Sequence, residues 1–168
     1  VTATGRDERD RILLVEEHQY FCVDETVFTA DVVARRTNYV YDDTSHVMAL
    51  TIDGVDCHVA DGVVDVRIQR RFDGNGHLLS ELMDGQTSTP GPPDGIDDSC
   101  SYFTYDDHGR LVRLEKDGGS VSGEVAFCDG VIDYAAVHVY DRTGREIRLE
   151  QDVDADGTAD LATQFYHD

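Results

Sequence analysis

An acidic turn recurs five times along this chain, and this internal repeat constrains the fold more than any other feature of the sequence. Each copy begins with an aspartate, at positions 7, 42, 73, 106 and 141, so successive copies lie 35, 31, 33 and 35 residues apart. The clearest copies are residues 105–111 (YDDHGRL), 140–145 (YDRTGR) and 72–78 (FDGNGHL), whereas 41–45 (YDDTS) and 6–11 (RDERDR) are weaker. A period of this length is typical of an array of small structural units.

Two further acidic positions recur in phase with the turn. Eleven residues after the turn aspartate the chain carries Asp53, Asp84, Asp117 and Asp152, with His18 in the first copy. Twelve residues before the next turn it carries Asp61, Asp94, Asp129 and Asp156, each opening an Asp-Gly-x-x-Asp signature. All length variation falls between these two positions. With Ala30 as the second position of the first copy, they are 12, 8, 10, 12 and 4 residues apart. Because surface loops absorb insertions more easily than paired strands do, this segment is predicted to be a loop.

The segments on either side of each turn predict β-strands. After the turn, apolar residues alternate with polar ones, as Ile147 and Leu149 do with their neighbours, and a period of two indicates one buried face. Before the turn come aromatic and β-branched runs such as 39–41 (YVY) and 103–105 (FTY), which favour strands. The Asp-x-x-Gly between them fits a type I turn whose fourth residue takes a positive φ.

These patterns predict an all-β protein in which residues 1–168 form a single array. We expect about five β-hairpin repeats of 31–35 residues, joined in a continuous twisted or spiral antiparallel sheet. The hairpin tips are predicted near residues 7–10, 42–45, 73–76, 106–109 and 141–144, and the loop of variable length closes the far end of each hairpin.

The Tyr-Asp-x-x-Gly-Arg-Leu motif, recurring after an aromatic strand, resembles the Rhs/YD-repeat family over essentially the whole chain. The resemblance implies a secreted or surface bacterial protein whose repeats build a long spiral β-sheet, which in several members wraps a toxin domain or serves adhesion. Five repeats are too few for a closed shell, so we expect a fragment of a longer protein or a short relative. The catalytic regions of the family lie outside its repeats, so no catalytic or cofactor-binding residue is expected here.

The fifth far-end loop predicts a calcium site. In residues 152–160 (DVDADGTAD) carboxylates stand at the first, third, fifth and ninth positions and a glycine at the sixth, which suits a hard cation that takes six to eight oxygen ligands. The expected ligands are Asp152, Asp154, Asp156, Asp160 and the carbonyl oxygen of Thr158. The loop resembles the thrombospondin type 3 calcium loop and lacks the Glu of an EF-hand, since Thr163 stands at position twelve. The alternative is an Asp-rich surface turn that binds nothing specifically.

The four cysteines accompany the longer far-end loops. Cys22, Cys57 and Cys128 lie inside such loops, Cys100 lies just after one, and the short fifth loop has none. We interpret this distribution as disulfides replacing a metal as the clamp at that edge. Four cysteines allow three pairings, and proximity of neighbouring repeats favours Cys22–Cys57 and Cys100–Cys128. The alternative is four free buried thiols in a cytosolic protein.

Composition excludes several classes of partner. The chain has 35 acidic and 14 basic residues, a formal charge of −21, which argues against nucleic-acid binding because phosphate contacts require clustered Lys and Arg. No apolar run of about 18 residues exists, so no membrane-spanning helix is expected. The seven histidines follow the repeat, and neither a nucleophile elbow nor a phosphate loop is present, so we do not expect an enzyme. The Pro-rich insertion 87–93 is predicted to be a solvated excursion or a partner-binding loop.

The sequence thus favours a non-enzymatic structural or binding module of a secreted or surface bacterial protein, stabilised by calcium and disulfides. Its expected partners are neighbouring repeats or domains of a parent chain, together with glycans or another protein at the cell surface. The alternative is a segment of an Rhs-type shell that encloses a toxin, with the effector domain outside this chain.

Overall fold

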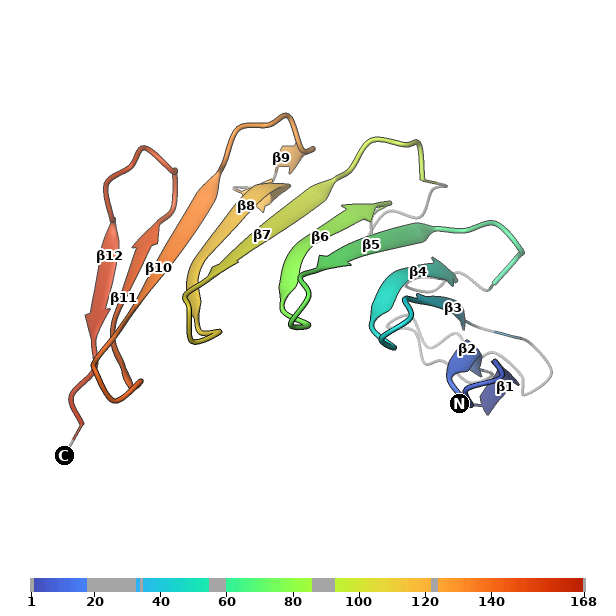
Figure 1. Ribbon diagram of the computed structural model, residues 1–168. Helices are drawn as coiled ribbons and strands as arrows, with labels where there is room; N and C mark the ends of the chain where they lie inside the picture. Colours follow the sequence, from blue (N-terminus) through green and yellow to red (C-terminus); the bar gives the residue numbers. More distant parts are fainter. Residues whose placement is uncertain are drawn as a thin grey trace. The chain divides into compact units, whose positions relative to one another are not determined.

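The computed structural model describes residues 2–17, 33, 35–54, 60–85, 93–121 and 124–167, and all regular structure in these ranges is β-strand. The strands are β1 (Thr2–Arg6), β2 (Ile12–Glu17), β3 (Arg35–Tyr41), β4 (Val47–Asp53), β5 (Val66–Phe72), β6 (Leu78–Asp84), β7 (Ser99–Tyr105), β8 (Leu111–Val121), β9 (Glu124–Ala126), β10 (Tyr134–Tyr140), β11 (Glu146–Asp152) and β12 (Leu161–Gln164). Consecutive strands are neighbours in one open antiparallel sheet, except that β9 pairs only with β8 (Figure 1). The predicted all-β hairpin array is confirmed.

Within the described ranges no helix has the length and hydropathy that a membrane crossing requires.

Each predicted tip joins two strands of one hairpin, so we number the hairpins one (β1–β2), two (β3–β4), three (β5–β6), four (β7–β8) and five (β10–β11). At the tip of hairpin four, Asp106 Oδ1 accepts hydrogen bonds from the backbone N–H groups of His108 (2.9 Å) and Arg110 (3.0 Å). Gly109 has a φ of 75°, and the register shifts at Tyr105. These features match a type I turn followed by a bulge. At the tip of hairpin two, Ser45 takes the glycine position at a φ of 74°.

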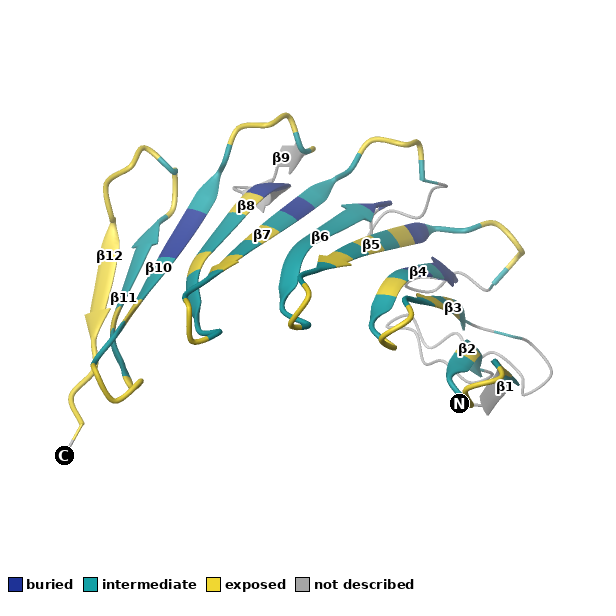
Figure 2. Ribbon diagram, in the orientation of Figure 1, coloured by how far each residue is buried: buried dark blue, intermediate teal, exposed yellow. Residues whose placement is uncertain are grey.

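The chain divides into two compact units, one formed by Val1–Arg70 with Met83–Ile96 and the other by Arg71–Leu82 with Asp97–Asp168. The core of the first unit consists of Leu50, Ile52 and Val66. In the second unit the buried residues include Cys100, Ala135, Ala136 and Asp117. Figure 2 shows that the buried segments of hairpins two to five lie toward the far-end loops and not toward the tips. The far ends, where the repeated aspartates stand, are therefore the packed part of the molecule.

Neighbouring hairpins are joined at their tips by the residue four positions after the turn aspartate. The guanidinium carbon of Arg11 lies 4.8 Å from the ring centroid of Tyr41, and Arg110 lies 4.7 Å from that of Tyr140. Both tyrosines also donate a 2.8 Å hydrogen bond from their hydroxyl to the preceding hairpin, Tyr41 to the carbonyl oxygen of Ile12 and Tyr140 to that of Leu111. The tyrosines before the turn aspartates of hairpins two and five thus fasten each of these hairpins to the previous one.

The turn aspartates predict a loss of stability in acid. The hydrogen bond from the Arg110 side chain, followed by that from its backbone N–H, lowers the pKa of Asp106 from 3.8 to about 2. Because the folded pKa lies below the unfolded one, this stabilisation is complete above pH 4 and is lost as the pH falls toward 2. We expect the urea midpoint of the wild type to exceed that of Asp106→Asn at pH 5, and the difference to shrink by pH 2. A difference that stays constant over this range would contradict the assignment.

Candidate metal centre

The repeated aspartate at the end of each second strand closes the far-end loop in hairpins two, three and four. Asp117, only 2% exposed, accepts backbone N–H hydrogen bonds from Asp129 (3.1 Å) and Gly130 (2.9 Å), one on each carboxylate oxygen. Asp53 binds the N–H groups of Asp61 and Gly62 in the same way, and Asp84 those of Asp94 and Gly95. Both oxygens of each buried carboxylate are thereby satisfied, which compensates for their burial.

The second aspartate of the Asp-Gly-x-x-Asp signature makes a complementary bond. Its carboxylate accepts the backbone N–H of the residue that follows the loop-closing aspartate. Asp65 accepts from Gly54 (2.7 Å), Asp133 from Gly118 (2.8 Å) and Asp160 from Val153 (2.8 Å). In these three loops the signature therefore holds the two ends of the loop together.

The fifth far-end loop departs from this pattern at one atom. Asp152 Oδ2 accepts the N–H of Gly157 (2.8 Å), as in the other copies, but the N–H of Asp156 turns to Asp154 Oδ1 (3.3 Å). Asp152 Oδ1 is left buried, and it has no hydrogen-bond partner. The shorter loop thus removes one of the two donors, and an uncompensated buried carboxylate oxygen is costly.

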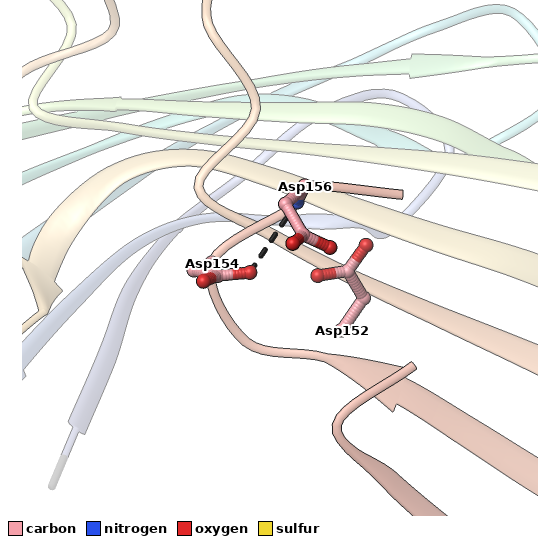
Figure 3. A group of neighbouring side chains, drawn as sticks. All are labelled: Asp152, Asp154 and Asp156. Atoms are coloured by element: carbon pink, nitrogen blue, oxygen red, sulfur yellow. Dashed lines mark hydrogen bonds between the residues drawn. The ribbon is translucent and has the colours of Figure 1, made fainter. Parts of the chain in front are cut away.

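This oxygen belongs to a carboxylate that faces two others. One oxygen each of Asp152, Asp154 and Asp156 lie within 4.8 Å of one another, and Figure 3 shows the carboxylates of Asp152 and Asp156 directed toward each other beside Asp154. Asp154 and Asp156 are exposed, so a cation could reach the cluster from solvent. Gly157, the glycine at the sixth position of the loop, has a φ of 92°. Ala155 has a φ of 51°, a conformation that L-residues rarely adopt.

Three of the five predicted ligands, Asp152, Asp154 and Asp156, therefore come together. Asp160 lies outside the cluster, bonded to the N–H of Val153. Thr158 donates its N–H to Asp156 Oδ1 (2.8 Å). The oxygen donor set of the cluster fits a hard divalent cation, which would neutralise three converging negative charges. Coordination by the carbonyl oxygen of Thr158 stays a prediction.

The cysteines behave partly as predicted. Cys100 of β7 and Cys128 of the fourth far-end loop form a disulfide with a Cα–Cα distance of 6.1 Å. Cys128 also donates its N–H to the carbonyl oxygen of Asp97 (2.8 Å), so the loop is held beside β7 by both contacts. The predicted Cys22–Cys57 pair, His18 and most of the insertion 87–93 lie outside the described residues.

Sequence reasoning missed the principal use of the repeated far-end aspartates. It interpreted the longer loops as sites where disulfides replace a metal clamp, and it did not foresee that Asp53, Asp84 and Asp117 accept hydrogen bonds from backbone N–H groups. The available signal was the invariant Asp-Gly pair in copies two to five. A glycine with positive φ lets its N–H and that of the preceding residue point at one carboxylate, and Gly62, Gly95, Gly130 and Gly157 have φ values of 89–96°.

Comparison with known proteins gives little further information. No protein-family model matches the chain, and no curated protein matches it. Among solved structures, the chain aligns with one titled "Crystal Structure of TcdB2-TccC3-TEV", with a TM-score of 0.40 and 14% sequence identity. The alignment covers 90% of this chain and 8% of that one. The family and function of this chain are accordingly argued from its own residues.

Proposed function

We propose that this chain is a structural and binding repeat module that performs no catalysis. The observation that carries the proposal is the equivalent use of its polar residues from copy to copy. Turn aspartates cap hairpin tips, far-end aspartates close loops, and Arg–Tyr pairs join hairpins. The polar groups that recur in this sequence are thus engaged in holding the array together, as expected for repeats stabilised by their neighbours.

We infer that the module works outside the cytoplasm, as a spacer, shell segment or adhesive surface of a secreted or surface bacterial protein. The Cys100–Cys128 disulfide supports an oxidising compartment. Membership of the Rhs/YD-repeat family is supported by the roles of the motif's own residues, since the tyrosine fastens hairpins and the aspartate caps the tip. Enclosure of a toxin by a longer shell is the finer proposal, and the coding region beyond residue 168 would test it.

We further propose that calcium stabilises the fifth far-end loop. The unpartnered Oδ1 of Asp152 supports the proposal, since its carboxylate belongs to the cluster in the described loop whose spacing is reduced to four residues. Bound calcium would link the end of β11 to the start of β12, because the cluster lies between these two paired strands. The ion would then act as the clamp that the disulfide provides in the fourth loop.

Calcium is expected to raise the melting temperature of the wild type. A dissociation constant of about 10⁻⁴ to 10⁻³ M is usual for extracellular calcium modules, and about 10 mM calcium then contributes roughly 1.4 to 2.7 kcal/mol. In a chain of this size that corresponds to a shift of roughly 3 to 10 °C. Asp154→Ala and Asp156→Ala should lose this shift, as measured by differential scanning calorimetry with and without calcium.

The matched control is Asp129→Ala. Asp129 is exposed and accepts the N–H of Val131 (2.8 Å), the same local bond that Asp156 makes with Thr158, but it stands in the fourth loop. This variant should keep the full calcium shift. Equal shifts in all four proteins, or none in any, would mean that the loop is only a solvated turn. Failure of this test would leave the structural role of the array intact.

A further inference from the structure

The tips of hairpins three and four enclose a solvent-open hollow of about 510 Å³. Its wall on hairpin three includes Asn75 and His77, and its wall on hairpin four includes Tyr105, Asp106 and Asp107. The imidazole of His77 stacks on the ring of Tyr105 with a centroid separation of 4.7 Å. One face of the tyrosine is therefore covered, while Asp107 is exposed.

The equivalent positions between hairpins one and two hold two arginines. The repeat aligns Asn75 with Arg9 and His77 with Arg11, two and four residues after the turn aspartate. Arg9 Nη1 donates to the carbonyl oxygen of Asp43 (2.6 Å), and Arg11 Nη1 donates to that of Asp42 (2.7 Å). The tip of hairpin two is thus bound by guanidinium groups that belong to hairpin one.

The shorter Asn75 and His77 leave the matching acceptors of hairpin four without this partner. Asp106 and Asp107 correspond to Asp42 and Asp43, and within the described ranges no side chain donates to their carbonyl oxygens. The Asp106 carbonyl receives the turn hydrogen bond from Gly109 (2.9 Å), but the carbonyl of its counterpart Asp42 receives both a turn bond and the Arg11 bond. Acceptors that bind arginine in one copy thus border an open hollow in another.

We propose that this hollow binds the guanidinium group of an arginine side chain from a partner polypeptide. The incoming group donates to the carbonyl oxygens that correspond to those bound by Arg9 and Arg11 two junctions earlier, between hairpins one and two. Its planar fork has enough N–H donors to serve both carbonyl oxygens and the Asp107 carboxylate. The chain's net charge of −21 attracts a cationic segment over longer distances. The site discriminates arginine from lysine because one compact ammonium cannot reproduce the planar, divergent donor set.

The test uses the whole chain and three small probes, namely the N-acetyl amides of arginine, lysine and citrulline. Citrulline keeps the shape of arginine but lacks its charge. In ¹H–¹⁵N correlation spectra, the arginine probe should produce saturable shifts confined to residues 73–79 and 103–109. Binding of the lysine and citrulline probes should be at least about fivefold weaker, because charge-assisted and bidentate hydrogen bonds are the stronger ones.

Two pairs of variants locate the site. Asn75→Arg places an arginine where hairpin one has Arg9. Its guanidinium group should occupy the hollow and weaken binding of the arginine probe about tenfold, whereas Asn75→Gln should leave binding nearly unchanged. Asp107→Asn should weaken binding, while Asp43→Asn, the same charge change at a tip already bound by Arg9, should not. Shifts spread over all acidic tips, equal binding of lysine, or full binding to Asn75→Arg would overturn the proposal.

Discussion

Replacing Asp117 with alanine is expected to destabilise the protein by about 3 to 5 kcal/mol. The change removes two hydrogen bonds to a charged acceptor, each of which contributes roughly 1.5 to 3 kcal/mol. It also leaves the N–H groups of Asp129 and Gly130 without their acceptor at a site that is 2% exposed. Urea unfolding followed by circular dichroism measures the effect as a lower midpoint at an unchanged slope.

The matched control is Asp107→Ala, which removes the same carboxylate from an exposed position of hairpin four. Surface substitutions of this kind usually change stability by less than about 0.5 kcal/mol. Asp117→Asn adds a second comparison, because its amide can accept one N–H but presents a donor to the other. The urea midpoint of Asp117→Asn should lie between those of the wild type and Asp117→Ala, or below both. Near-equal stability of Asp117→Ala and Asp107→Ala would show that the far-end carboxylates do not hold the loops.

Loss of the Cys100–Cys128 disulfide is expected to cost between about 3 and 4 kcal/mol. The bond joins residues 28 positions apart, and closing a loop of that length restricts the unfolded chain by roughly this amount. Cys128→Ala tests it, since Cys128 is only partly buried whereas Cys100 is 2% exposed and its removal would also leave a cavity. The urea midpoint of the variant should fall, and added reductant should then lower the wild type more than the variant.

Peptide mapping without reductant supplies an independent check. A cross-linked peptide pair containing residues 100 and 128 should be recovered from the wild type. Alkylation of Cys128 in the native, untreated protein would contradict the pairing. Because the two cysteines belong to the same compact unit, we expect reduction to loosen the fourth far-end loop first, and hydrogen exchange at residues 127–130 would detect that.

Some of these features could be predicted from the sequence because their causes are local. A turn aspartate and the N–H groups that it accepts lie two and four residues apart, as Asp141 shows with Thr143 and Arg145. The turn therefore forms wherever the motif occurs, and all five tips could be placed before the structure was known. The alternation that defines the strands is equally local, and the regular period then dictates an array of hairpins.

The arrangement of the fifth far-end loop was predicted less completely. Spacing alone was enough to predict that Asp152, Asp154 and Asp156 come together, because alternating positions in a tight loop lie on one side of it. Spacing could not show that Asp160 bonds to the N–H of Val153, since that contact depends on how β11 and β12 pair. Nor could it show that Asp152 Oδ1 is buried without a partner.

The sequence by itself determined the repeat and the position of each tip, and it favoured the Cys100–Cys128 pair that the structure contains. Only the tertiary structure decided what the far-end aspartates bind, how Arg11 meets Tyr41, and where a hollow remains between tips. The physical reason is separation along the chain. Asp117 lies 12 residues from the N–H of Asp129, and Arg11 lies 30 residues from Tyr41, so these groups meet only after strands have paired and hairpins have come side by side.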